Sequence, residues 1–174
     1  MDKIKAAFAG KKANIGYIVA GYPSPAHTKE FLSNLDESAI DLLEIGIPYS
    51  DPLADGPEIF KASFSAAQNG VNAEKVFEIL KEVQTHKPLV FLVYYNVIFA
   101  YGAREFVVQA ARYGISGLII PDLPYEENEE IFALCEEFGI ALIPLISVTS
   151  EHRAARVLSR ARGFIYGVGA IGVT

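Results

Sequence analysis

Cysteine is almost absent from this sequence, and so is any excess of positive charge. The single cysteine, Cys135, excludes an internal disulfide and fits a protein of the reducing cytoplasm. Acidic residues outnumber basic ones by 21 to 15, and the net charge of -6 argues against nucleic-acid backbones as partners. No apolar run is long enough to span a bilayer, and the segment after Met1 lacks the apolar region of a secretory signal. The three histidines lack ligand spacing, so no metal site is expected at His27, His86 or His152.

The sequence instead alternates short apolar runs with longer amphipathic ones. The short runs are rich in Ile, Val, Leu and aromatic residues, as expected for parallel strands that are buried on both faces. The expected strands are Ile15–Ala20, Leu42–Ile47, Leu89–Tyr94, Leu118–Ile120, Ala141–Ile146 and Phe164–Val168. Capping residues, prolines and glycines mark the ends of the segments between them. The expected helices run from Ser24 to about Ser38, from Asn72 to before Pro88, and over about Ala103–Tyr113, Glu126–Phe138 and Glu151–Arg160.

Strands that alternate with helices indicate βαβ units and therefore a parallel sheet with right-handed crossovers. No repeat or linker-like stretch divides residues 1–174, so we expect a single domain. Six strands are compatible with an open doubly wound sheet or with most of a barrel, and periodicity does not decide between them. A dinucleotide-binding sheet is disfavoured, because Gly21-Tyr22-Pro23 follows the first strand in place of a Gly-x-Gly-x-x-Gly turn.

Glu44 is an ionisable residue inside an otherwise apolar strand, Leu42–Ile47. An unpaired carboxylate is costly to bury, so such a group either finds a partner or takes up a proton. Burial raises a carboxyl pKa toward neutrality, which is what a general acid or base needs. A structural carboxylate paired with a Lys or Arg explains the same position equally well.

The loop after this strand holds two acids among prolines, in the run Pro48-Tyr49-Ser50-Asp51-Pro52-Leu53-Ala54-Asp55-Gly56-Pro57. Proline stiffens the backbone, which would hold Asp51 and Asp55 in fixed positions at the carboxyl end of the strand, where parallel folds place their sites. Asp and Pro are also ordinary turn formers, and the pattern alone slightly favours that interpretation.

That run, preceded by Glu44-Ile45-Gly46, resembles the signature of tryptophan synthase alpha chains. The similarity continues along the whole sequence, at Ala20-Gly21-Tyr22-Pro23, Tyr95-Asn96, Pro121-Asp122-Leu123-Pro124 and Gly172-Val173-Thr174. The resemblance implies a TIM (β/α)8 barrel. It also implies a lyase of tryptophan biosynthesis that cleaves indole-3-glycerol phosphate, without a cofactor, to indole and glyceraldehyde 3-phosphate by retro-aldol chemistry.

The same resemblance implies roles for individual residues. Glu44 matches the general acid/base, Asp55 the carboxylate that accepts the indole N–H, and Tyr166 a tyrosine that orients the acid/base. The positions that match the indole pocket are Tyr17, Leu92, Tyr94 and Ile119, although Leu92 and Ile119 would serve equally well as plain barrel core. The family also implies a partner, the pyridoxal-phosphate-dependent beta chain of an alpha2-beta2 assembly, and we expect Pro48 and Asp51 to dock it.

Two departures from the family pattern limit these expectations. Gly167-Val168-Gly169-Ala170-Ile171 replaces a more polar, serine-containing stretch. Relatives continue past Thr174 with two more βα units, so residues 1–174 are expected to form about the first six units of the barrel, an incomplete domain. It would lack the phosphate-binding loops and be inactive alone. The alternatives are another phosphate-binding barrel, such as an isomerase or epimerase, or a non-catalytic subunit that docks on a partner; the joint presence of Glu44, Asp55 and Tyr166 favours the lyase.

Overall fold

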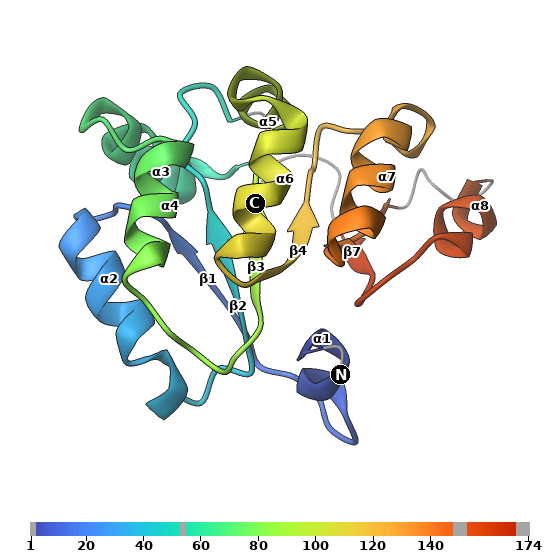
Figure 1. The fold of residues 1–174 in the computed structure, drawn as a ribbon, viewed down its shortest axis with the longest axis horizontal. Coiled ribbons are helices and arrows are strands. Elements are labelled where there is room, and N and C mark those ends of the chain that lie inside the picture. Colours follow the sequence, from blue (N-terminus) through green and yellow to red (C-terminus); the bar gives the residue numbers. More distant parts are fainter. Residues whose placement is uncertain (1–2, 53–54, 148–152, 170–174) are drawn as a thin grey trace.

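The computed structural model describes residues 3–52, 55–147 and 153–169 as a curved parallel sheet with helices on its outside (Figure 1). The strands are β1 (Ile15–Val19), β2 (Leu42–Gly46), β3 (Leu89–Leu92), β4 (Ile115–Ile119), β5 (Ala141–Leu142), β6 (Leu145–Ser147) and β7 (Tyr166–Val168). The helices are α1 (Lys3–Phe8), α2 (Pro25–Ser33), α3 (Pro57–Gln68), α4 (Ala73–Lys81), α5 (Tyr95–Tyr101), α6 (Ala103–Arg112), α7 (Glu129–Phe138) and α8 (Ala154–Ser159), with 3-10 turns η1 (Leu35–Glu37) and η2 (Tyr125–Glu127). No helix among these residues is long and apolar enough to cross a membrane.

The strands follow one another in sequence order, and every pair is parallel. Strands β1 to β5 form one sheet, and β6 pairs with β7. The expected fifth strand is therefore divided into β5 and β6, and Pro144 lies at the division. The Ile143 N–H donates to the carbonyl of Leu118 on one side, whereas the Pro144 carbonyl accepts from Tyr166 on the other. The N–H and C=O of one residue point to the same side of a strand, so Pro144 lacks a donor on the side of β7, and the ladder is interrupted where the chain changes its partner.

Successive residues along each strand enter two different cores. Leu43, Ile45 and Phe91 belong to the large core between the sheet and the outer helices. Leu42 and Val90 belong to a second core on the concave side. This alternation follows from the two-residue period of a strand, and it explains why the strands read as unbroken apolar runs: both faces are covered.

The expected helix ends are largely confirmed. The side chains of Ser24 and Asn72 cap α2 and α4 by accepting from backbone N–H groups three residues on, and Gly139 ends α7 in the left-handed conformation with φ of 70°. The first helix is shorter than expected, since α2 ends at Ser33 and η1 follows. The helix expected from Glu126 begins at Glu129, after η2, and the start of the last expected helix lies outside the described residues.

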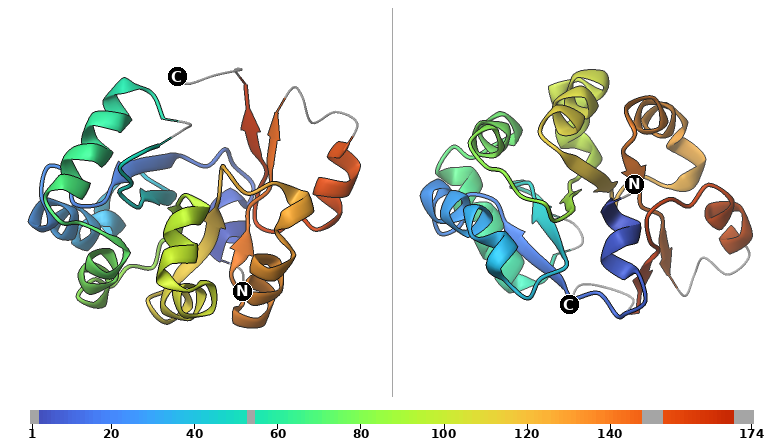
Figure 2. Two further views of the ribbon diagram at one scale, coloured as in Figure 1. Left: turned by 90° about the horizontal axis from the view of Figure 1, so that it is seen from above. Right: turned by 60° about the horizontal axis from the view of Figure 1, so that its bottom comes forward.

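Helix α1 was not expected from the sequence pattern, and it lies on the concave side of the sheet, opposite the outer layer of helices (Figure 2). Ile4 on this helix is fully buried in the concave core. Its Cδ1 lies 3.3 Å from the positions that a Cβ would take at Gly117 and at Gly163. These glycines leave room for the Ile4 side chain. Helix α1 therefore covers the inner core at the amino ends of the strands.

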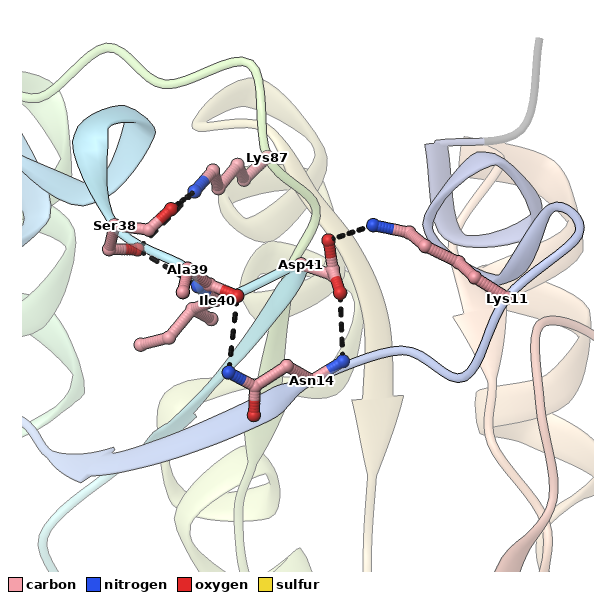
Figure 3. A network of polar contacts seen from close by, with 7 residues as sticks. All are labelled: Lys11, Asn14, Ser38, Ala39, Ile40, Asp41 and Lys87. Atoms are coloured by element: carbon pink, nitrogen blue, oxygen red, sulfur yellow. Dashed lines mark hydrogen bonds and ion pairs between the residues drawn. The ribbon is translucent and has the colours of Figure 1, made fainter.

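A polar network joins the loops that precede β1, β2 and β3 (Figure 3). The Asp41 carboxylate accepts from the Asn14 backbone N–H at 2.8 Å and from the ammonium of Lys11. The Asn14 side chain donates to the carbonyl of Ala39 at 3.1 Å, and Lys87 donates to that of Ser38 at 2.7 Å. These contacts lie at the amino ends of the strands, the face of such folds that serves stability rather than chemistry.

Candidate active site

A pocket of about 470 Å³ opens at the carboxyl ends of the strands. It brings together six of the seven candidate catalytic and substrate-binding residues, which come from β1, β2, β3, β4, β7 and the loop before α3: Tyr17, Glu44, Asp55, Leu92, Ile119 and Tyr166. Residues far apart in the sequence therefore share one site because parallel strands end at the same edge. The volume is in the range of small-molecule sites.

Glu44 points from β2 into this pocket and is only 6% exposed. Its neighbours across the sheet are Tyr17 on β1 and Val90 on β3. Among the described residues it forms no ion pair, which removes the structural explanation that a paired Lys or Arg would have supplied. Burial alone raises the pKa of Glu44 to about 7, because the charged form loses its hydration without gaining a cation.

Asp55 lies at the end of the loop, two residues before α3 begins. Burial raises the pKa of Asp55 above its ordinary value, and a hydrogen bond from the Tyr94 side chain acts in the opposite direction. The next residues fix the loop end: Gly56 is buried at the helix N-cap, and Pro57 occupies the first position of α3. Proline is well suited to that position, since its missing N–H would have had no partner inside the helix.

Tyr17 and Tyr166 line the pocket together with the two carboxyl groups. Burial raises the pKa of both phenols, and the negative charges of Glu44 and Asp55 raise it further, so both stay protonated and able to donate. The Tyr17 hydroxyl lies where a side chain on residue 46 would begin. Glycine at position 46 is therefore required for the Tyr17 ring to lie across the end of β2, a requirement that sequence reasoning did not recognise.

The candidate substrate-binding residues take two different places. Leu92 and Ile119 lie on the pocket wall with Tyr17, and their contact with substrate stays a prediction. Tyr94 is only 3% exposed and is not among the residues that line the pocket; its ring packs on the Tyr49 ring, with the ring centres 5.3 Å apart. Sequence reasoning had also passed over further wall residues, whose apolar or glycine character gave no signal of its own: Ile59, Pro121, Leu145, Gly167 and Gly169.

The two candidate docking residues differ in exposure. Pro48 is buried, whereas Asp51 is exposed and accepts a hydrogen bond from the Ser50 hydroxyl at 2.7 Å. Between them, the backbone of Tyr49 is bound to the buried Ser63 hydroxyl of α3, which accepts from its N–H at 2.9 Å and donates to its carbonyl at 3.0 Å. Leu53 and Ala54 lie outside the described residues.

Comparison with known proteins decides what this pocket belongs to. The family model described as tryptophan synthase alpha chain matches residues 4–174. A tryptophan synthase alpha chain from Campylobacter jejuni is 46% identical over 168 residues, which cover 96% of this chain and 68% of the relative. The chain belongs to the tryptophan synthase alpha chain family.

Solved structures place the alpha-chain fold on the same residues. Tryptophan synthase subunit alpha from Campylobacter jejuni superposes with a TM-score of 0.88 at 46% identity, over 96% of this chain and 68% of that one. A chain in a structure of Mycobacterium tuberculosis tryptophan synthase gives a TM-score of 0.89 at 32% identity, over 99% and 68% of the two chains. The curved sheet of Figure 2 is thus part of an alpha-chain β/α barrel.

Membership of the alpha-chain family also gives the reaction class. The protein is a carbon–carbon lyase of tryptophan biosynthesis, an indole-3-glycerol-phosphate lyase. The pocket agrees with that chemistry: its walls are mainly apolar, as a flat aromatic ring requires, and two carboxyl groups enter it from β2 and from the loop after β2. Among the described residues, no group of three or more His, Cys, Asp or Glu side chains could hold a metal ion.

Proposed function

We propose that Glu44, Asp55 and Tyr166 carry out the retro-aldol cleavage of indole-3-glycerol phosphate in this pocket, with Glu44 as the general acid/base. The observation that supports this most is the buried Glu44 carboxyl, which enters the pocket without a cation and has a pKa of about 7. A group that must both give and take a proton works best when its pKa is close to the working pH.

The reaction needs two proton movements and one broken bond. Protonation of the indole ring carbon that bears the side chain leaves a positive charge on the ring N–H. The acid/base then removes the proton of the hydroxyl on the adjoining carbon, and the C–C bond breaks. Its electron pair returns to the ring, which gives indole, and the oxygen becomes the aldehyde of glyceraldehyde 3-phosphate. Glu44 is the group whose pKa suits both proton transfers.

Asp55 supplies the counter-charge in this scheme. A carboxylate that accepts the ring N–H stabilises the positive charge that develops there, and a poorly hydrated pocket strengthens that interaction. Asp55 is suited to this because it lines the same pocket as Glu44. Tyr166 lines it too, and from β7 its protonated hydroxyl would orient the Glu44 carboxyl.

The first test replaces Glu44 by Gln in the protein as its gene encodes it. We expect a loss of roughly 10²–10⁴-fold in indole formation from indole-3-glycerol phosphate, because the shape is kept while the proton carrier is lost. Glu74→Gln, an exposed acid on α4, is the matched control and should keep normal turnover. Circular dichroism and a denaturant melt show that both variants are folded. Near-normal turnover by folded Glu44→Gln would refute the assignment.

We infer further that the loop of residues 48–57 docks a tryptophan synthase beta chain in an alpha2-beta2 assembly. Indole is small and apolar, so a lyase that passes it directly to the next enzyme avoids losing it to membranes and solvent. Asp51 is exposed, while Asp55, further along the same loop, lines the pocket. The relative from Mycobacterium tuberculosis was solved as tryptophan synthase, which supports an assembly of this kind.

Apolar surface close to the loop strengthens this inference. Phe60 and Phe64 on α3 stack with their ring centres 5.9 Å apart, and each is about two-fifths exposed. Phe99 on α5 is 70% exposed. Helix α3 follows the loop after β2 and α5 follows β3, so both helices begin at the carboxyl ends of strands, where the pocket opens (Figure 1). Exposed aromatic rings of this kind mark surfaces that partners cover.

A further inference from the structure

The loop that carries Asp55 begins where the hydrogen bonding of β2 to β3 ends. The Ile47 N–H still donates to the carbonyl of Leu92 at 3.0 Å, and Pro48 follows with no N–H to donate. Tyr49 is the next residue, and it is half-buried. Because a backbone group shielded from water is costly to leave without a partner, the course of the loop depends on what binds Tyr49.

A single hydroxyl group on α3 binds both backbone groups of Tyr49. The Ser63 hydroxyl accepts from the Tyr49 N–H at 2.9 Å and donates to the Tyr49 carbonyl at 3.0 Å. Ser63 is only 4% exposed, so little water competes for these bonds. A hydroxyl can do both tasks because it is a donor and an acceptor at once, whereas an alanine of nearly the same size can do neither.

The other end of the loop is fixed on the same helix. The Gly56 carbonyl accepts from the N–H of Phe60 at 2.8 Å, which forms the first turn of α3, and Gly56 itself is buried. Asp55 therefore lies between Tyr49 and Gly56, two residues whose backbones are both bound to α3. A segment held at both ends has fewer arrangements open to it, so the place of Asp55 in the pocket wall depends on both attachments.

The Tyr49 side chain is held by a different part of the fold. Its ring packs on the Tyr94 ring with the centres 5.3 Å apart, and its hydroxyl accepts from the Asn96 side chain of α5 at 3.3 Å. Loss of the Ser63 hydroxyl would leave these ring contacts in place and release only the backbone. The effect of Ser63 on the loop can therefore be separated from the packing of the Tyr49 ring.

We propose that Ser63 is a positioning residue for the lyase reaction: by binding the Tyr49 backbone, it holds the loop of residues 49–57 so that Asp55 faces the positive charge that develops on the indole ring. The proposal rests on the function proposed above for Asp55. It assigns Ser63 no contact with substrate, since Ser63 is not among the residues that line the pocket.

The test is Ser63→Ala in the full-length protein. We expect kcat to fall roughly 10–100-fold while KM changes by less than about threefold, because a displaced Asp55 fails to stabilise charge that is present in the transition state and not in the bound substrate. Ser65→Ala makes the same change two residues further along α3, and this matched control should keep the kcat of wild type. Wild-type kcat in folded Ser63→Ala would overturn the proposal, and so would a higher KM at unchanged kcat.

Hydrogen exchange of the Tyr49 amide, followed by NMR, does not depend on turnover. In wild type we expect this amide to exchange at least about 100-fold more slowly than an unprotected one, because it donates to a buried hydroxyl. In Ser63→Ala it should exchange at least about tenfold faster than in wild type, while the amides of β2 keep their rates. An unprotected Tyr49 amide in wild type would contradict the proposal whether or not the variant folds.

Asp55→Asn separates this proposal from the one on which it rests. If Ser63 acts through Asp55, adding Ser63→Ala to Asp55→Asn should lower kcat by less than about twofold further. A further fall by the full factor seen in wild type would show that Ser63 acts elsewhere. If Asp55→Asn turns over normally, the proposed role of Asp55 is wrong and Ser63 loses its task with it. If Asp55→Asn is impaired while Ser63→Ala matches wild type, the role of Asp55 stands and only that of Ser63 is refuted.

Discussion

The burial of the Glu44 carboxyl group affects both the stability of the fold and the proposed proton transfer. Its burial keeps the proton on until the pH reaches about 7, whereas the same group in an unfolded chain loses it near 4.5. Below the unfolded value both states are protonated and burial costs no charge. As the pH rises above it, the unfolded chain ionises first, so the folded state loses stability up to about pH 7. The property that suits Glu44 to proton transfer therefore costs the fold free energy at neutral pH.

This pH dependence of stability can be tested without an activity assay. Glu44→Gln removes the titrating group, so it should be more stable than wild type at pH 8, by up to about 3 kcal/mol, and equal to it near pH 4. The measurement is the free energy of unfolding in urea across this pH range. A constant difference between the two proteins at every pH would show that the Glu44 pKa is not shifted by folding.

Several helices and strands depend on contacts with distant segments, which their own sequences do not predict. Helix α1 has only six residues, too few to be stable alone, and it is held by burying Ile4 in the concave core. Helix α3 is linked to the loop before it, because Ser63 binds both backbone groups of Tyr49. The division between β5 and β6 depends on Pro144 together with the position of β7. In each case a distant segment completes the local structure.

The contribution of α1 can be measured by Ile4→Ala. Because Ile4 is fully buried against Gly117 and Gly163, we expect a loss of about 2–4 kcal/mol in the free energy of unfolding. Ile165→Ala is the matched control, since Ile165 is 49% exposed and should cost about 1 kcal/mol or less. Urea unfolding with a shared slope compares the two variants. Equal, small losses in both would show that α1 does not cover the core in solution.

The whole molecule has two ends with different tasks. Loops at the amino ends of the strands are joined by the network around Asp41, at the end opposite the active-site pocket (Figure 3). The carboxyl ends carry the pocket, and they are followed by the loop with the exposed Asp51 and by α3 and α5, which carry exposed aromatic rings. A partner that binds this second end would contact the same loop that ends in Asp55, so we expect docking and catalysis to be coupled through this loop.

Docking is tested by calorimetric titration of the beta chain with wild type and with Asp51→Ala. We expect Asp51→Ala to bind at least tenfold more weakly and to be less activated by the beta chain, because a charged contact at the mouth is lost. Glu74→Ala removes the same charge from the exposed face of α4 and should bind as wild type does. Unchanged affinity and activation in Asp51→Ala would exclude the proposed contact.

Elements with local signals could be predicted from the sequence. Apolar runs without alternation marked the buried strands, and Ser24, Asn72 and Gly139 marked helix ends through their own hydrogen bonds or dihedral angles. Glu44 stood out because a lone carboxylate in an apolar strand is physically unusual. Periodicity left barrel and open sheet undecided, and the motif around residues 44–57, together with shorter motifs along the chain, pointed to the family.

The contacts between distant residues became known only from the three-dimensional fold. Sequence reasoning could not tell that Glu44 has no cation beside it among the described residues, that Tyr17 needs glycine at position 46, or that Tyr94 lies outside the pocket wall. Each of these depends on the register and curvature of strands that are distant in sequence. A side chain's environment, and with it its pKa and its task, is set by neighbours that the chain supplies from elsewhere, and a local pattern carries no information about them.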